Sequence, residues 1–165
     1  MTTTHQQPSG KKGSIATLIQ WEARLQKSQI GHYAVSERYS KVSIWLKVPL
    51  VVVSAVASTT VIASFYEPTP QWVNYLAGSL SIIATVLAAL HSATRADDIS
   101  NSHERVASKY GTIRRSIETF LANADEDEDA VKFLHEIERR WDIVAEDAPV
   151  TPTWARRKAN LREQH

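Results

Sequence analysis

Few residues in this chain have the types and spacing that chemistry requires. Three of its six histidines, His91, His103 and His135, lie on predicted helices at no spacing relative to one another that suits metal ligands. There is no cysteine, no Gly-rich phosphate loop, no nucleophile elbow and no HExxH motif. Carboxylates gather only in the run 125–129, which is typical of a solvated helix N-terminus. We therefore expect no catalytic residues, no metal site, no cofactor and no enzyme activity.

Two histidines can nevertheless meet across a pair of helices. His32 and His103 interrupt two apolar seams that are predicted to face each other, where they could bind a metal, sense pH or fix the helix register. We favour the third role, because polar seam residues lower stability but specify packing. On that basis we expect His103→Leu to stabilise these helices while impairing activation. The candidates for such a seam or switch are His32, Tyr39, His103, Tyr110 and Arg114.

Two uncharged stretches organise the rest of the chain. No Asp, Glu, Lys or Arg occurs in 48–66 or in 68–94, and a spanning helix needs only about 20 mostly apolar residues. Two prolines within 67–70 exclude a continuous helix. The pattern predicts an all-α membrane protein with a two-transmembrane helical hairpin, whose spans are about 48–66 and 71–94. The alternative is the buried hairpin of a soluble helical bundle, which normally carries charge on its outward face.

Basic residues near the span ends predict the orientation. Arg38, Lys41 and Lys47 precede the first span, Arg95 and Arg105 follow the second, and the turn between the spans has no Lys or Arg. Because Lys and Arg stay on the cytoplasmic side, both termini are expected in the cytoplasm.

Small and hydroxyl-bearing residues interrupt both spans. On the second span they recur at steps of three and four, which places them on one helix face. Small residues let helices approach closely in lipid, so the stripe predicts a homo-oligomer. The candidates for oligomer contacts or a pore lining are Ser54, Ser58, Asn74, Gly78, Ser81, Thr85 and Ser92.

Polar segments flank the spans. We expect a disordered N-terminus over 1–13, and over 14–122 the hairpin with two long cytoplasmic helical extensions, the first capped by Ser14 and kinked at Pro49. A turn centred near residue 69 places Val35 near His103. An acidic loop and a third, short helix follow over 123–148.

The remaining residues, 149–165, read as a Pro-broken basic tail that is either solvated or rests on anionic lipid. A formal net charge of +1 gives no reason to expect direct nucleic-acid binding.

The order and spacing of several short motifs resemble the SLATT family. These are bacterial two-span proteins named for their association with SMODS nucleotidyltransferases and SLOG sensor domains. The resemblance covers about residues 21–121 and transfers nothing to the third helix or the tail. It is carried by Trp21, Arg24, His32-Tyr33, Arg38-Tyr39, residues 45–49 and 77–90, His103, Ala107, Tyr110, Ile113-Arg114-Arg115 and Ile117-Glu118.

The resemblance implies a membrane effector of bacterial defence against phage, acting by abortive infection. Such an effector forms pores in the inner membrane or disrupts it when a separately encoded partner detects infection. The partner is a nucleotidyltransferase that makes a nucleotide signal, a SLOG protein or a reverse transcriptase. The alternative is a non-conducting membrane scaffold that recruits partners through its cytoplasmic coiled coil.

Overall fold

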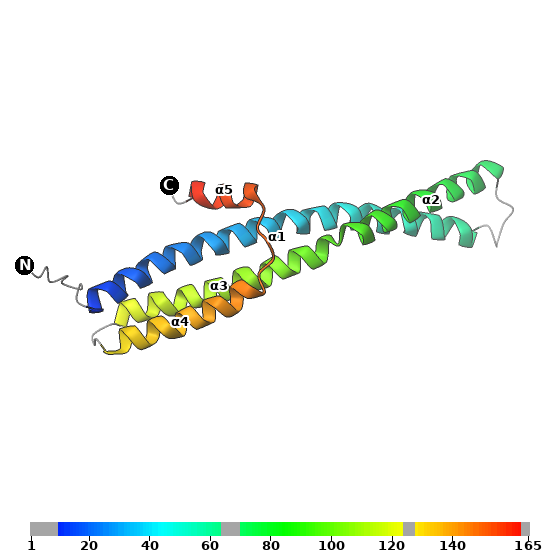
Figure 1. Ribbon diagram of the computed structural model, residues 1–165. Helices are drawn as coiled ribbons and strands as arrows, with labels where there is room; N and C mark the ends of the chain where they lie inside the picture. Colours follow the sequence, from blue (N-terminus) through cyan, green and yellow to red (C-terminus); the bar gives the residue numbers. More distant parts are fainter. Residues whose placement is uncertain (1–9, 64–69, 124–127, 163–165) are drawn as a thin grey trace, which may run out of the picture. The chain divides into compact units, whose positions relative to one another are not determined.

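The computed structural model describes residues 10–63, 70–123 and 128–162, and five helices account for nearly all of them. In chain order they are α1 (Gly10–Ala63), α2 (Gln71–Thr94), α3 (Ala96–Asn123), α4 (Glu128–Glu146) and α5 (Thr153–Arg162) (Figure 1). The chain divides into two compact units. Unit 1 comprises residues 1–36 and 101–165, and unit 2 comprises residues 37–100.

Unit 1 is built on amphipathic helices whose apolar faces meet. The first part of α1 supplies Leu18 and Leu25, both fully buried, and α3 and α4 supply the rest of the core. On α3 and α4 the buried positions recur at steps of three, four and seven, as expected for one face of a helix. They are Val106, Tyr110, Ile113, Ile117, Ile137 and Val144.

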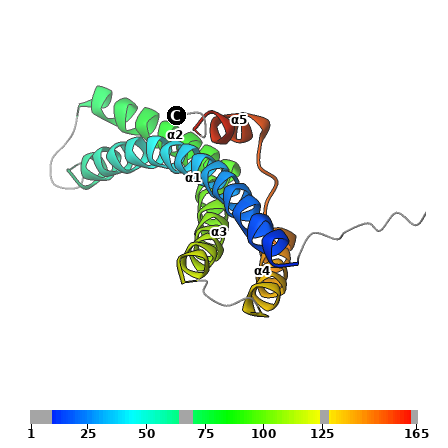
Figure 2. The same ribbon diagram turned by 90° about the vertical axis from the view of Figure 1, so that its left-hand side faces the viewer.

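Aromatic side chains of α4 pack against α1 and α3 within unit 1. The ring of Trp21 on α1 meets Trp141 on α4 edge to face, with ring centroids 5.7 Å apart. Phe120 of α3 stacks on Phe133 of α4 at 4.2 Å, so α3 and α4 lie side by side (Figure 2). Such pairs add about 0.5–1.5 kcal/mol beyond the apolar area that they bury.

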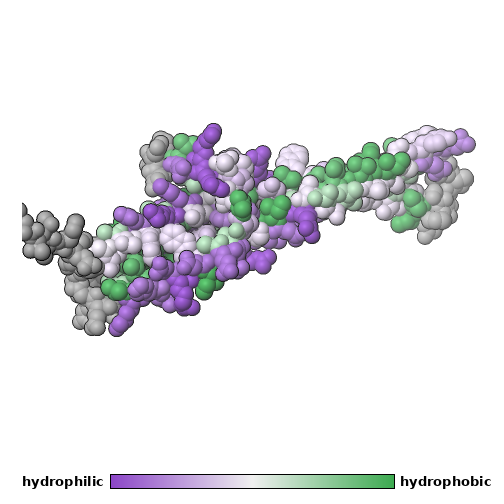
Figure 3. Space-filling view, viewed as in Figure 1, coloured by the Kyte–Doolittle hydropathy of each residue, from purple (hydrophilic) through white to green (hydrophobic). Residues whose placement is uncertain are grey.

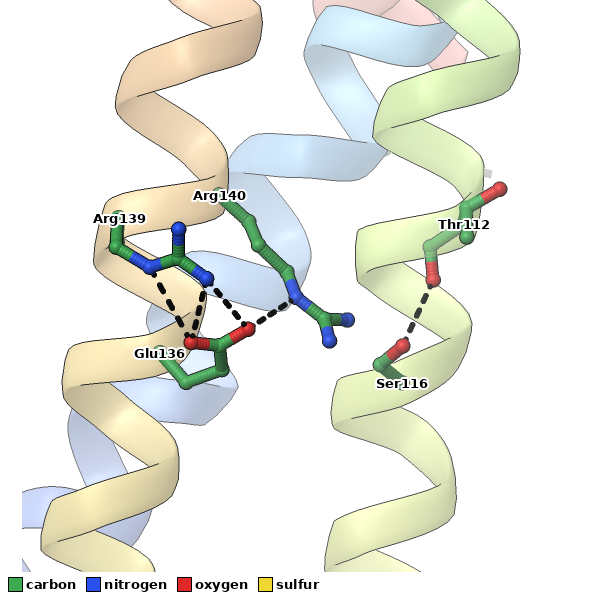
Figure 4. A network of polar contacts seen from close by, with 5 residues as sticks. All are labelled: Thr112, Ser116, Glu136, Arg139 and Arg140. Atoms are coloured by element: carbon green, nitrogen blue, oxygen red, sulfur yellow. Dashed lines mark hydrogen bonds and ion pairs between the residues drawn. The ribbon is translucent and has the colours of Figure 1, made fainter.

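Several polar contacts on the exposed faces of α3 and α4 join residues of the same helix. Arg139 and Arg140 both bind the carboxylate of Glu136 on their own helix, at 3.0 and 2.7 Å (Figure 4). On α3 the Ser116 hydroxyl donates to the Thr112 carbonyl. Exposed ion pairs of this kind contribute little to stability, because solvent screens them. The apolar core therefore holds these helices together.

Part of the predicted Pro-broken basic tail forms a helix, α5. In α5, Ala155 and Ala159 are buried four residues apart, on one face of the helix. The sequence did not indicate this helix because alanines give almost no apolar periodicity, although they favour helix formation. Pro152 lies just before the first residue of α5, where a proline does not interrupt a helix.

Unit 2 combines the later part of α1 with α2, which lies alongside it in both views (Figures 1 and 2). Both helices are long and apolar enough to cross a membrane. Only 6% of the most apolar 18 residues of α1 are buried within the protein, and the corresponding part of α2 buries almost none of its residues. Figure 3 shows the hydrophobic side chains gathered along this part of the chain. A soluble core helix would instead be mostly buried.

Several helix ends differ from the sequence-based prediction. The helix α1 begins at Gly10, so Ser14 lies inside it instead of capping it, and residues 10–13 are helical. Pro49 lies inside α1, so the helix continues past this proline. The predicted second span and α2 share the bounds 71–94. Three predictions fall partly outside the described residues. They are the disordered N-terminus (residues 1–9), the end of the first span (64–66) and the acidic loop (124–127).

The chain does not continue from α2 into α3 as one uninterrupted helix. Arg95 separates α2 from α3 with φ 45° and ψ 33°, in the left-handed region that non-glycine residues rarely adopt. We predicted that the second span would run on into its helical extension. Instead, α2 ends at Thr94, Arg95 breaks the helix, and α3 starts at the next residue, Ala96.

Candidate functional site

A buried pair of histidines joins α1 to α3 in unit 1. Nδ1 of His32 lies 2.9 Å from Nδ1 of His103, and the two ring centroids are 4.9 Å apart. Each side chain is only 4% exposed. One imidazole must donate its N–H and the other must accept, since each neutral ring has one donor and one acceptor nitrogen. We expected Val35 opposite His103, and the structure instead places His32 there, about one helical turn away.

Two further residues complete the surroundings of His32. Its Nε2 lies 3.2 Å from the Thr151 hydroxyl, in the segment between α4 and α5. The ring of Tyr110 lies 5.7 Å from that of His32. A chain of polar contacts therefore runs from the segment before α5 through α1 to α3. This links parts of the sequence that are more than a hundred residues apart.

Burial keeps the histidine pair neutral at ordinary pH. It lowers the pKa of His32 from 6.5 to about 4, with a further contribution from the charge of a protonated His103. Burial likewise lowers the pKa of His103 and raises that of Tyr110. A switch operating near neutral pH needs a pKa close to 7, so these values favour the packing role over pH sensing.

The other predicted seam residues lie elsewhere. Tyr39 belongs to unit 2 and is half-buried. Arg114 forms an ion pair of 3.2 Å with Glu118 on its own helix. Among the described residues no group of three or more His, Asp or Glu side chains is arranged to hold a metal ion.

A second polar centre, in unit 2, was not predicted. Asp97, in the first turn of α3, accepts a hydrogen bond of 2.7 Å from the Ser43 hydroxyl of α1. Its other carboxylate oxygen lies 2.7 Å from Nζ of Lys47 and 3.6 Å from Nε2 of His91. The bonds from Lys47 and Ser43 lower the pKa of Asp97, so the carboxylate is held in its charged form. The sequence signal that could have indicated this centre is a lysine, Lys47, just before the first uncharged stretch and an acid, Asp97, shortly after the second.

The stripe of small residues on α2 is not on the face that packs against α1. Its members Asn74, Gly78, Ser81, Thr85 and Ser92 are all exposed in unit 2. The face toward α1 is a different one, which carries buried Ala77 together with half-buried Val73, Leu80, Ala84 and Leu87. On α1, Ser54 is half-buried and Ser58 is exposed.

Hydroxyl groups in the apolar helices bond to their own backbone. Ser81 donates to the Ala77 carbonyl at 2.9 Å, and Thr85 donates to the Ser81 carbonyl at 2.8 Å. Thr59 and Thr60 do the same on α1. A hydroxyl satisfied in this way can face hydrocarbon without an unpaired donor.

Comparison with known proteins identifies the family. The sequence model of one protein family, the SMODS and SLOG-associating 2TM effector domain family 4, matches residues 20–160 of the chain. That range includes α4 and most of α5, so the resemblance drawn from motifs, which ended near residue 121, was too short. No curated protein matches the chain, and no solved structure does.

Proposed function

We propose that this chain, which belongs to the SMODS and SLOG-associating 2TM effector domain family, opens a conducting path in the bacterial inner membrane. A separately encoded partner triggers it when phage infection is detected, and the cell then dies or stops growing. The family's name implies association with SMODS and SLOG proteins, so the trigger is a nucleotide-signal synthase or a SLOG-type sensor.

The observation that carries the proposal is the exposure of the apolar stretches of α1 and α2. At 1.5 Å per residue, the 24 residues of α2 extend about 36 Å, enough to cross about 30 Å of hydrocarbon. A continuous apolar surface that is exposed along a whole helix marks contacts with lipid or with other proteins. We infer two transmembrane passes with both termini in the cytoplasm, because Lys41 and Lys47 precede the first and Arg95 follows the second.

A conducting path needs several copies of the chain, because two helices enclose no lumen. The exposed stripe on α2 supports such an assembly, since small residues allow helices to pack closely in lipid. Its hydroxyls suit both a closed and an open state. They bond to the backbone when they face lipid and to water when a pore opens.

The test follows membrane potential and dye entry in cells that express the chain with its neighbouring genes during phage infection. We expect depolarisation and dye entry that Ser81→Leu or Thr85→Leu abolishes, together with a changed oligomer mass in mild detergent. Ser79→Leu is the matched control. Its hydroxyl also bonds one turn back, to Tyr75, but it lies on another face of α2.

Protection from phage with an unchanged potential and no dye entry would rule out the pore. The non-conducting scaffold would then account for the protein. Equal effects of Ser79→Leu and Ser81→Leu would instead show that the stripe is not a specific interface.

A further inference from the structure

An open groove of about 860 Å³ runs between α3 and α4 in unit 1. Its lining residues on α3 extend from Thr112 to Asn123, about 16 Å at a rise of 1.5 Å per residue. Two half-buried aromatic side chains, Phe120 and Phe133, stack on each other at 4.2 Å and line it. Because the groove follows two neighbouring helices, it suits a peptide segment better than a compact small molecule.

Arg140 brings a positive charge to this groove from α4. Its Nε donates to the carboxylate of Glu136 at 2.7 Å, and Arg139 binds the same carboxylate at 3.0 Å. Two guanidinium groups thus share one negative charge, so the cluster retains one positive charge. Figure 4 shows the Arg140 guanidinium reaching from α4 toward Thr112 and Ser116 on α3. In the part of the chain that the structure describes, Arg140 bonds only through Nε, which leaves both of its Nη groups as donors.

Arg115 adds a second positive charge from α3. Its Nη2 donates to the Thr112 hydroxyl at 3.3 Å, which engages one N–H without neutralising the charge. Glu118, three residues further along the same helix, forms its ion pair with Arg114 instead, at 3.2 Å. No acid is among the described residues that line the groove. Each of the two helices therefore contributes a guanidinium group, and the groove carries a net positive charge.

We propose that this groove docks an acidic helical segment of a separately encoded partner protein. A guanidinium group binds a carboxylate through two parallel N–H···O bonds, so neighbouring acids of the partner match Arg115 and Arg140. Phe120 lies five positions, about 7.5 Å, along α3 from Arg115. Its stacked pair with Phe133 therefore meets an apolar side chain about one helical turn from those acids. Arginine and aromatic side chains are also the types enriched in protein interfaces.

A nucleic acid fits this groove less well than a protein segment does. Nucleic acids bind through several phosphates in succession, and two guanidinium groups do not supply that number of cations. The docking rests on the proposed function, because the partner is the separately encoded trigger. Its measurement needs neither infection nor ion flow, so a failure to bind and a failure to conduct are separate results.

The experiment measures the binding of a labelled helical peptide to the full chain in nanodiscs by fluorescence anisotropy. The peptide has two adjacent glutamates and a leucine one turn later, on a background of alanine and glutamine. We expect saturable binding that Arg115→Gln or Arg140→Gln weakens by about tenfold, the effect of one lost charge-assisted hydrogen bond. Replacing both glutamates of the peptide with glutamine should weaken its binding to the unaltered chain at least as much.

Arg105→Gln is the matched control. It removes the same charge from the same helix as Arg115→Gln, but Arg105 lies outside the groove, so affinity should change less than about twofold. Thr119→Glu adds a carboxylate to the exposed lining and should prevent binding. Circular dichroism verifies that each variant folds. The proposal is overturned if Arg105→Gln weakens binding as much as Arg115→Gln, or if the glutamine peptide binds as tightly as the glutamate peptide.

The competing occupant is the acidic run 125–129 of the chain itself, from the same copy or a neighbouring one. Changing the acids at 125–127 to their amides separates the two occupants. A gain in peptide affinity of more than about tenfold would show that this run fills the groove, which also overturns the proposal. A change of less than about threefold supports the external partner.

Discussion

Replacing His103 with leucine is expected to destabilise unit 1. The substitution removes the 2.9 Å bond to Nδ1 of His32, which is buried and screened from solvent. A buried polar atom left without its partner costs about 1–3 kcal/mol. Leucine fills a site that the imidazole already occupied, so little new apolar area offsets this cost. We expect a net loss of about 1–2 kcal/mol in the free energy of unfolding.

A double-mutant cycle isolates this bond. Replacing both partners of a buried hydrogen bond with apolar groups is nearly neutral. The variant with both His32→Leu and His103→Leu should therefore be more stable than His103→Leu alone. Thr151 loses its contact with His32 in that variant, but this hydroxyl is only half-buried and can bond to solvent.

The assay is denaturant unfolding of the full chain in mild detergent, followed by circular dichroism. His135→Leu is the matched control because this histidine is exposed, and it should change stability by less than about 0.5 kcal/mol. A more stable His103→Leu, or strictly additive effects of the two substitutions, would refute the reasoning. The sequence alone suggested a gain in stability. The bond to His32 reverses that expectation.

Three other changes test the rest of the structure. Because the pKa of His32 is lowered from 6.5 to about 4, the unfolded chain binds more protons between these values, so acidification should destabilise unit 1 by about 3 kcal/mol across that window. Chemical unfolding at a series of pH values measures the slope, which should flatten in His32→Asn. Ile117→Ala should lower the free energy of unfolding by about 2–5 kcal/mol, because Ile117 is fully buried, whereas Ile143→Ala on the exposed side of α4 should have little effect in the same assay. Asp97→Asn should lower the thermal midpoint only slightly, because its pair with Lys47 is partly exposed, and a thermal shift that Lys47→Gln does not alter further would verify the pairing.

Charge and proline patterns were sufficient to place the apolar helices. The bounds of α2 follow from the prolines before Gln71 and from the first charged residue, Arg95. The stripe of Ala130, Ile137 and Val144 likewise indicated α4, because large and regularly spaced apolar residues define a helix face. These signals are local, so a single sequence contains them.

Contacts between distant segments were harder to predict. Counting residues from a common turn centre placed Val35, about one turn from His32, opposite His103, because it assumes two uninterrupted helices, whereas α2 ends at Thr94 and α3 begins at Ala96. Thr151 was missed because α5 buries only alanines, and Asp97 was missed because its bond to Ser43 joins residues 54 positions apart. Neither contact leaves a periodic signal in the chain.

The backbone at Arg95 also limits which amino acids selection can retain there. Glycine, and after it asparagine and aspartate, adopts the left-handed conformation at the lowest cost, while other residues pay about 1–2 kcal/mol. In a library of all substitutions scored by protein abundance, glycine and asparagine should be enriched at this codon. Valine and isoleucine should be the most depleted. The torsion angles at this position thus favour a small residue, although the chain has a large cationic one there.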